Sequence, residues 1–451
     1  MTLKKLFSLS LISLLSACSL VTYQPNKTIS QINPQQGYRQ RLVMEGALQD
    51  GNLVILMFSG GGSRAAALGY GVLEQFETAR VKPSAKGSML IDNIDLVYGV
   101  SGGSVLATYY ALHGRDVVPQ FAENFLKKNF QREIINQVFS LSNMPRLTSP
   151  QFGRGDLLQE QLNMTLYHGA TFGDLERKRK GPFAVISATD MNMGQKITFT
   201  QETFDGLCLD LSALEIARAV AASSSVPLVF APLTLNNNGG NCHFTMPREF
   251  VMREQTSNGL TTKNVEEVKH MLTLYQNSKE RPFIHLVDGG LTDNLGLGAI
   301  VDISDMFGME QLYQQLQQKN QLKNIIVINV NAQNEVTNEV DKTADVPSIG
   351  NVINTVINVP IDKNTQNTLR RFREFTDSWN QYAAKAKGRK INMHFVGLGL
   401  KELPESDLKK DVLNISTSFY LPKSDVDKLR QAAQILLQNS AEYHRALSAL
   451  Q

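Results

Sequence analysis

The chain has little of several features that define common classes of protein. Among its 451 residues there are only three cysteines, too few for a disulfide-built scaffold or a four-cysteine zinc site. The formal net charge is +3, and no stripe of Lys and Arg dominates, which argues against a nucleic-acid binder. No apolar run of roughly 20 residues lies inside the body, so no internal membrane span is expected. The 42% of hydrophobic and 19% of charged residues are a globular composition with ample material for a core.

The N-terminal residues have the layout of an export signal. Two lysines precede an apolar stretch over 6–14, and Leu15-Ser16-Ala17-Cys18 follows. The apolar stretch is too short to span a bilayer. Its ending resembles the bacterial lipobox, which implies a signal peptide over 1–17 and a diacylated Cys18 that attaches the chain to a membrane. Ser19 resembles an outer-membrane sorting signal, so we expect a lipid-anchored protein of the bacterial cell envelope, in the outer membrane. An uncleaved anchor or a plain secretion signal is the alternative.

Export also changes what is expected of the other two cysteines. In an oxidising compartment Cys208 and Cys242 can pair, and a disulfide between them is one alternative. Two buried thiols are the other, because the sequence does not fix the geometry of the pair.

The rest of the chain alternates strand-like and helix-like segments. Residues 18–40 are polar and predict a tether behind the lipidated cysteine, and 41–335 form the predicted catalytic domain. Within that domain 236–281 begin with a loop signal and predict an insertion. Residues 336–451 predict a helical extension packed on the domain. The alternation predicts an α/β fold with a mostly parallel central sheet covered by helices on both faces. The apolar runs expected as strands are 53–58, 95–100, 183–188, 283–287 and 325–330.

One motif has the pattern of a serine nucleophile. Gly99-Val100-Ser101-Gly102-Gly103 matches G-x-S-x-G, with a buried strand before it and a helix after it. In that context Ser101 occupies a sharp turn with its hydroxyl exposed, and Gly99 and Gly103 allow close backbone packing. The alternative is an ordinary strand–turn–helix with a capping serine.

A second glycine-rich turn, Gly60-Gly61-Gly62-Ser63-Arg64, also joins a strand to a helix. It lacks the ending of a phosphate-binding P-loop. Consecutive glycines can turn their N–H groups toward one point, so Gly60, Gly61, Gly62 and Arg64 are the candidate oxyanion hole. For the Arg64 side chain the alternatives are a brace for the loop, a contact with an anionic headgroup, or an ordinary surface arginine.

A serine nucleophile needs a base, and Asp288 is the candidate. It follows the apolar strand 283–287, precedes Gly289-Gly290, and is expected at the edge where open α/β sheets place their sites. An aspartate in an ordinary turn is the alternative. The seven histidines do not occupy positions that suit a Ser–Asp–His triad.

Together these motifs resemble the signature of the patatin-like phospholipases, over roughly residues 50–300. The stretches 221–227 and 291–296 are also similar to that family. Many patatins have Asp where this chain has Ser59, and Gly where it has Ala65. The resemblance implies a three-layer α/β/α sandwich, a Ser101–Asp288 dyad without histidine, and neither metal nor cofactor.

The expected substrate is a membrane phospholipid or lysophospholipid, cleaved by phospholipase A or lysophospholipase chemistry. A catalytically inactive lipid-binding or scaffolding envelope lipoprotein is the alternative, and the sequence identifies no protein partner. A short basic run, 177–180, predicts either a contact with anionic lipid or a solvated turn.

Overall fold

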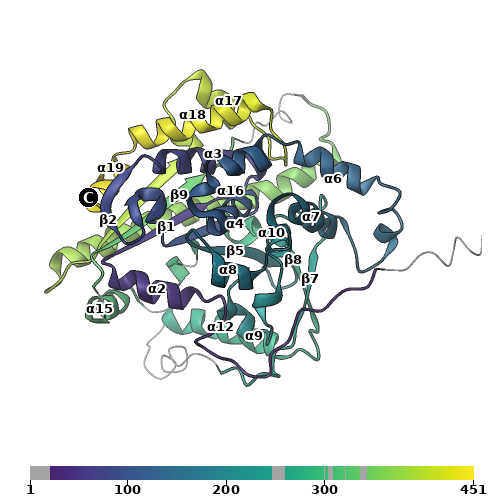
Figure 1. Ribbon diagram of the computed structural model, residues 1–451, viewed down its shortest axis with the longest axis horizontal. Helices are drawn as coiled ribbons and strands as arrows, with labels where there is room; N and C mark the ends of the chain where they lie inside the picture. Colours follow the sequence, from purple (N-terminus) through teal and green to yellow (C-terminus); the bar gives the residue numbers. More distant parts are fainter. Residues whose placement is uncertain (1–20, 246–259, 299, 303–307, 320, 336–342) are drawn as a thin grey trace, which may run out of the picture.

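The computed structural model describes residues 21–245, 260–298, 300–302, 308–319, 321–335 and 343–451. The predicted signal peptide and Cys18 lie outside these residues. A central sheet of eight strands has the order β10-β9-β1-β4-β5-β8-β7, with β6 beside β5 (Figure 1). The strands are β1 (Asn52–Phe58), β4 (Leu96–Val100), β5 (Phe183–Asp190), β6 (Lys196–Thr198), β7 (Leu233–Asn236), β8 (Phe283–Val287), β9 (Asn324–Asn331) and β10 (Asn392–Gly399); β2 (Arg80–Ser84) and β3 (Gly87–Met89) form a separate pair.

The middle of the sheet is parallel, as the sequence predicts. β10, β9, β1, β4 and β5 all run the same way, with Phe58 paired to Gly99 and Val100 to Ser187. These strands come from near-continuous apolar runs, and almost all their residues are buried. Such runs suit a strand covered on both faces, because both sets of alternating side chains then leave water.

Helices cover both faces of the sheet. The helices are α2 (Gln40–Gln49), α3 (Gly62–Phe76), α4 (Gly102–His113), α5 (Val117–Phe121), α6 (Phe130–Val138), α7 (Arg154–Leu162), α8 (Phe172–Lys178), α9 (Gln201–Gly206), α10 (Ile216–Ser223), α12 (Leu260–Gln276), α13 (Gly290–Asp293), α15 (Met309–Lys319), α16 (Ile349–Lys385), α17 (Asp407–Leu413), α18 (Lys423–Asn439) and α19 (Ala441–Ala449).

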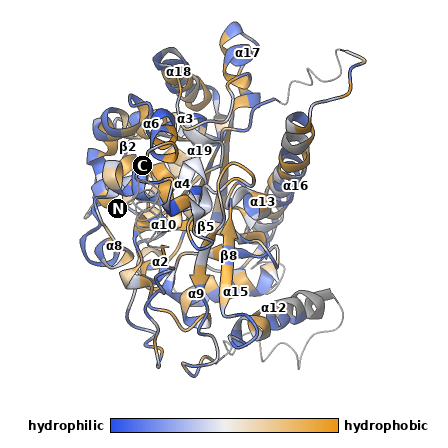
Figure 2. Cartoon of the chain, turned by 90° about the vertical axis from the view of Figure 1, so that its right-hand side faces the viewer, coloured by the Kyte–Doolittle hydropathy of each residue, from blue (hydrophilic) through white to orange (hydrophobic). Residues whose placement is uncertain are grey.

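The three-layer arrangement follows from which helices pack where. α3 and α4 lie on one face, with α18 packed along α3, whereas α15 and α16 lie on the other (Figures 1 and 2). α18 approaches α3 so closely that a Cβ on Gly71 would lie 2.8 Å from the Cα of Arg430. On the opposite face, the Trp379 indole of α16 donates a hydrogen bond to the Ile391 carbonyl just before β10. No helix within the described ranges is both long and apolar enough to cross a membrane.

The C-terminal extension differs from the sequence prediction, because it is not only helical. β10 lies within residues 336–451 and pairs in parallel with β9 along its whole length, so the extension completes the edge of the central sheet. A single apolar run late in a polar, helix-rich segment gave little signal for this pairing, which depends on a neighbour distant in sequence.

The segment predicted as a tether also differs. Residues from Val21 onward lie against the body rather than free of it. The Tyr23 hydroxyl accepts the Asn236 amide N–H at 2.8 Å, Thr28 forms a bridge with Leu209, and Tyr38 is fully buried. Polar composition suggested a linker, but the polar groups are used in contacts with β7 and its surroundings.

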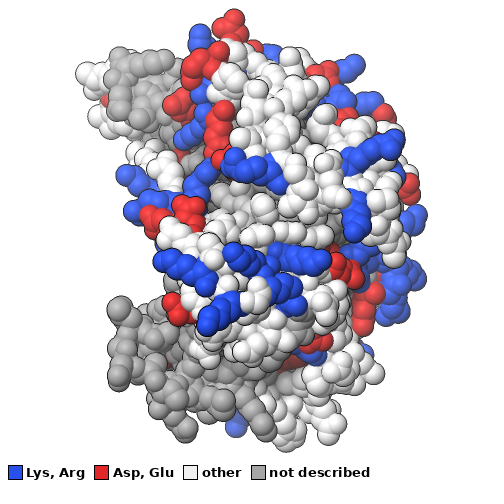
Figure 3. All heavy atoms as spheres, turned by 90° about the vertical axis from the view of Figure 1, so that its left-hand side faces the viewer, with Lys and Arg blue, Asp and Glu red and all other residues white. Residues whose placement is uncertain are grey.

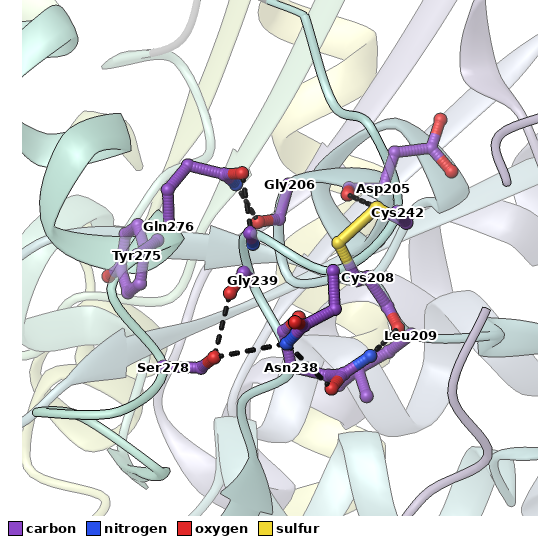
Figure 4. The surroundings of a disulfide bond; sticks show 12 residues. Asp205, Gly206, Cys208, Leu209, Asn238, Gly239, Cys242, Tyr275, Gln276 and Ser278 are labelled. Carbon is purple, nitrogen blue, oxygen red and sulfur yellow. Dashed lines mark hydrogen bonds between the residues drawn. A yellow bond between two sulfur atoms is a disulfide. The ribbon is translucent and has the colours of Figure 1, made fainter. Parts of the chain in front are cut away.

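A disulfide joins Cys208, just after α9, to Cys242 in the loop after β7 (Figure 4). Their Cα atoms are 5.5 Å apart and both residues are buried. Nearby, the Gln276 side chain at the end of α12 donates to the Gly206 carbonyl. The disulfide and this hydrogen bond therefore hold the predicted insertion, between β7 and β8, against α9.

Candidate active site

Ser101 lies where the chain turns sharply from β4 into α4. Its φ of 50° and ψ of −125° are unfavourable for a residue with a side chain, so the surrounding structure must impose them. A Cβ on Gly99 would lie 2.6 Å from the Cα of Ser104, and one on Gly103 would lie 2.5 Å from the Phe58 carbonyl oxygen. Only glycine fits at these two positions, which explains the G-x-S-x-G spacing in physical terms.

Asp288 reaches Ser101 by a route that the sequence did not predict. We expected its strand to end with the parallel strands, but β8 runs antiparallel to β5, with Val287 paired to Thr189. β5 extends beyond its pairing with β4, so β8 starts outside the site and runs back toward it. The end of β8 therefore brings Asp288 beside the strand–helix turn at Ser101. A Cβ on the next residue, Gly289, would lie 2.3 Å from the Ser187 carbonyl oxygen, so the chain turns here in close contact with β5.

Ser101 and Asp288 are both almost fully buried, with exposed fractions of 6% and 7%, and the Ser101 side chain is close enough to Asp288 to affect the pKa of its carboxyl. Burial raises the pKa of Asp288 from 3.8 to about 6, while hydrogen bonds from the Gly290 amide and the Ser101 hydroxyl lower it. Desolvation therefore dominates, since it disfavours the charged carboxylate. The carboxyl is still mostly ionised at neutral pH and is a stronger base than an exposed aspartate.

Hydrogen bonds to two serines at the end of α10 hold the backbone of Ser101 and of the Asp288 turn in place. Ser223, the last residue of α10, accepts the Ser101 amide N–H at its hydroxyl (2.8 Å) and the Gly289 N–H at its carbonyl (3.1 Å). The Ser225 carbonyl accepts the Asp288 N–H at 3.0 Å. These serines connect the turn at Ser101 to the Asp288 turn. Neither was predicted as a site residue, and their place in the family-like stretch 221–227 was the only indication of a role.

The glycine-rich loop lies beside the nucleophile. A Cβ on Gly60 would be 3.4 Å from the Cβ of Ser101. Gly61 and Gly62 have φ of +133° and +60°, and a Cβ on Gly62 would lie 2.4 Å from the Ser418 carbonyl oxygen. Among the described residues no acceptor engages the N–H of Gly61 or Gly62. Both amides are therefore candidate donors to an oxyanion.

Gly60 does not fit the role predicted for it. Its N–H donates to the Asn294 carbonyl at 3.2 Å, and is therefore occupied. Asn294 also places its Oδ1 2.5 Å from where a Cβ of Gly60 would be, so a larger residue has no room. Gly60 thus positions the loop. Asn294 was not singled out as a site residue, although it lies in the family-like stretch 291–296.

Arg64 is a brace and not an oxyanion donor. Its buried guanidinium donates to the carbonyls of Ala332 (2.7 Å) and Ile415 (2.6 Å), and to the Asn334 side chain (3.4 Å). Burial lowers the pKa of Arg64 to about 10, with the charge of Asp362 opposing the shift, so the group stays protonated at neutral pH. Burial excludes both the surface arginine and the headgroup contact.

Ser59, where many patatins have Asp, also holds the loop. Its hydroxyl accepts the Ala332 N–H at 2.9 Å and donates to the Gly60 carbonyl at 2.9 Å. The substitution therefore retains an anchoring hydrogen bond. No group of three or more His, Cys, Asp or Glu side chains arranged to hold a metal occurs in the described part of the chain.

Comparison with known proteins identifies a family for this chain. The family described as patatin-like phospholipase matches residues 56–301. Human GIVD cytosolic phospholipase A2 is similar in structure, with a TM-score of 0.46 and 11% identity over 93% of this chain and 68% of that one. VipD from Legionella pneumophila has a TM-score of 0.31 and 11% identity over 96% of this chain and 73% of that one. Both likenesses are too distant to carry a functional argument. No match was found among curated proteins.

Proposed function

Because the chain belongs to the patatin-like phospholipase family, a family of lipid acyl hydrolases, we propose that Ser101 and Asp288 are its catalytic dyad. The single observation that supports this most strongly is the buried pair: a strained serine at a strand–helix turn and, beside it, an aspartate whose pKa burial raises to about 6. The substrate class that we propose is a membrane phospholipid or lysophospholipid.

The proposed reaction has two halves. In the first, the Ser101 hydroxyl oxygen bonds to the ester carbonyl carbon, and its proton passes to the Asp288 carboxylate. The N–H groups of Gly61 and Gly62 hold the negative oxygen of the tetrahedral intermediate. Collapse breaks the bond to the alcohol, which leaves with the proton from Asp288. In the second half Asp288 takes a proton from water, whose oxygen bonds to the acyl carbon of the acyl-serine. Collapse of this second tetrahedral intermediate breaks the bond to the Ser101 oxygen, which takes the proton back from Asp288, and the fatty acid is released.

Acyl release tests the dyad directly. We expect the wild-type protein to release free fatty acid from mixed phosphatidylethanolamine and phosphatidylglycerol, whereas Ser101→Ala and Asp288→Ala release none. Ser88→Ala is a matched control, because Ser88 is exposed on β3, in a two-stranded sheet separate from the central sheet that carries the site. A fluorophosphonate probe should label the wild type and the control but not Ser101→Ala. An active Ser101→Ala protein with unchanged circular dichroism would contradict the mechanism. If the wild type neither reacts nor releases acid, a catalytically inactive lipid-binding lipoprotein becomes the better explanation.

We also propose that Cys18 is diacylated and anchors the protein in the outer membrane of a bacterium. The lipobox-like sequence supports this proposal. Cys18→Ala should move the full chain from the membrane fraction to the soluble fraction of cells. Unchanged retention under high salt and alkaline washing would refute anchoring through Cys18.

A further inference from the structure

Resting on the proposed function, we propose that the end of the molecule that carries the dyad is a docking face for the bilayer in which the chain is anchored. Three segments form this docking face: 134–153, which covers the end of α6 and the loop to α7; 223–234, the loop after α10; and 346–361, the start of α16. Figure 2 looks onto this end, with α6 and α16 on either side of β5 and β8.

Exposed apolar side chains gather on these segments. Of the fifteen large hydrophobic side chains that are exposed in the described part of the chain, the three segments hold eleven. They are Ile135, Phe139, Leu141, Met144, Leu228, Val229, Val346, Ile349, Val352, Val356 and Val359. Single exposed apolar residues are ordinary, but such a concentration on three segments is a feature of interaction surfaces.

The start of α16 has its apolar face turned outward. Ile349, Val352, Val356 and Val359 follow the spacing of one helix face, and Val356 is 67% exposed. Farther along, the buried residues of the same helix, such as Trp379, lie on the opposite side of the helical wheel and face the sheet. The apolar face of α16 therefore points outward in its first half and toward the sheet in its second half. The core of the protein covers the apolar face of the second half, whereas no described residue covers that of the first.

The docking segments are also almost free of charge. Segment 134–153 contains one charged residue, Arg146, and segments 223–234 and 346–361 contain none, whereas 19% of the whole chain is charged. The opposite end of the molecule is different. Figure 3 faces it and shows Lys and Arg interspersed with Asp and Glu, and the basic run 177–180 lines a cavity there with Asp92 and Asp95. A surface without charges enters an interface at the lowest desolvation cost.

Contacts connect two of the docking segments, or the residues next to them, to the Asp288 turn. The Ser225 carbonyl in the second segment accepts the Asp288 N–H. Past the end of the third segment, the Asn364 side chain donates to the Thr292 carbonyl at 2.9 Å, next to the Asp288 turn. From there the helix extends back by about 20 Å to its first turn, at 1.5 Å per residue.

The path of the N-terminal segment identifies the occupant as a bilayer. The Ser149 hydroxyl donates to the Val21 carbonyl at 2.6 Å, and the Tyr23 N–H donates to the Gln151 side chain at 2.8 Å. Both partners belong to segment 134–153. Cys18 precedes Val21 by three residues, which span at most about 11 Å. An acylated Cys18 would therefore hold this end of the molecule, and no other, close to the membrane. Ser101 would then face lipid without a long tether.

Vesicle flotation tests the docking face with the full chain carrying Cys18→Ala, so that no acyl anchor masks weaker binding. We expect this parent protein to float with phosphatidylethanolamine–phosphatidylglycerol vesicles. Two double variants, Val352→Gln with Val356→Gln and Phe139→Ser with Leu141→Ser, should each weaken vesicle binding by about tenfold or more. Met164→Gln is the control: Met164 is 59% exposed but lies beyond the other end of α7.

A monomeric short-chain ester separates docking from chemistry. Both double variants should hydrolyse it at the parent rate, while their release of fatty acid from vesicles falls in step with binding. Variants that float like the parent, or a parent that does not bind vesicles, would overturn the docking face. So would a dimeric parent that the Val352/Val356 variant makes monomeric without any change in flotation. A parent that floats but neither reacts with fluorophosphonate nor cleaves any ester would refute the proposed enzyme and leave the docking face standing.

Discussion

Replacing Asp288 by Asn should abolish activity and make the protein more stable at neutral pH. Asn has nearly the same shape, and its side-chain oxygen can still accept the Gly290 N–H, which lies 2.8 Å from the carboxylate. What the substitution removes is a charge that is buried without a cationic partner among its hydrogen bonds. The gain in stability should therefore follow the ionisation of Asp288.

The size of the gain follows from the pKa. The carboxyl has a pKa of about 6 in the fold against 3.8 when exposed, so the folded state holds the proton more tightly. Stability from this group is complete below pH 3.8 and is lost as the pH rises through 6. A shift of about two units corresponds to about 3 kcal/mol. Asp288→Asn should thus be more stable than wild type by about 1 kcal/mol at pH 4.5 and about 3 kcal/mol at pH 7 and above.

Urea unfolding of both proteins at pH 4.5, 6 and 7.5, with the disulfide intact, measures this difference. The kcat/KM of the wild type on a monomeric ester gives an independent reading, because it should fall about tenfold per pH unit below pH 6 as Asp288 becomes protonated. The reasoning that burial raises the pKa of Asp288 would be refuted by a stability difference that does not change with pH. It would also be refuted if kcat/KM began to fall only near pH 4.

Three further changes test the supporting structure. Gly62→Ala places a Cβ 2.4 Å from a backbone carbonyl oxygen and should cost about 10²–10³ in kcat, whereas Gly46→Ala, with open space around it, should leave kcat unchanged. Arg64 bonds its three acceptors from three different nitrogens, whereas Arg64→Lys has its donors on a single nitrogen that cannot reach all three, so it should lower both the thermal midpoint and kcat; an unchanged midpoint would contradict the bracing role. Reduction, or paired Cys208→Ala and Cys242→Ala substitution, opens a loop of 34 residues and should cost about 3–4 kcal/mol of stability in urea unfolding. Alkylation of both thiols without prior reduction would show that they are not paired.

Local sequence was sufficient for much of the fold. The apolar runs that form β1, β4, β5 and β9 were recognisable because strands buried on both faces need nearly continuous hydrophobic residues. The run that forms β8 was recognisable too, although its first and third residues are exposed. The two glycine-rich turns were recognisable because close backbone approach excludes a side chain there. Their order along the chain suggested the nucleophile and the base together.

The direction of β8 and the pairing of β10 could not be predicted in this way. Strand direction and sheet membership depend on partners far away in sequence, and an apolar run is the same in either direction. For a similar reason Gly60 was assigned a donor role that its occupied N–H does not fit, and the choice among the alternatives for Arg64, of which a brace was one, stayed open. The partner of the Gly60 N–H is fixed only when folding brings Asn294 beside it. The partners of the Arg64 guanidinium are likewise fixed only when the carbonyls of Ala332 and Ile415 come beside it.

By itself, then, the sequence determined the α/β class, the mostly parallel sheet, and the residue types at the proposed nucleophile, the proposed base and the glycine loop. Each is encoded in a short stretch whose local chemistry has few alternatives. Only the tertiary structure decided which amides remain free for an oxyanion, how far burial shifts the pKa of Asp288, and which apolar residues remain exposed around the dyad. Those properties are set by the groups that exclude water from a site or leave it open, and such groups come from distant parts of the chain.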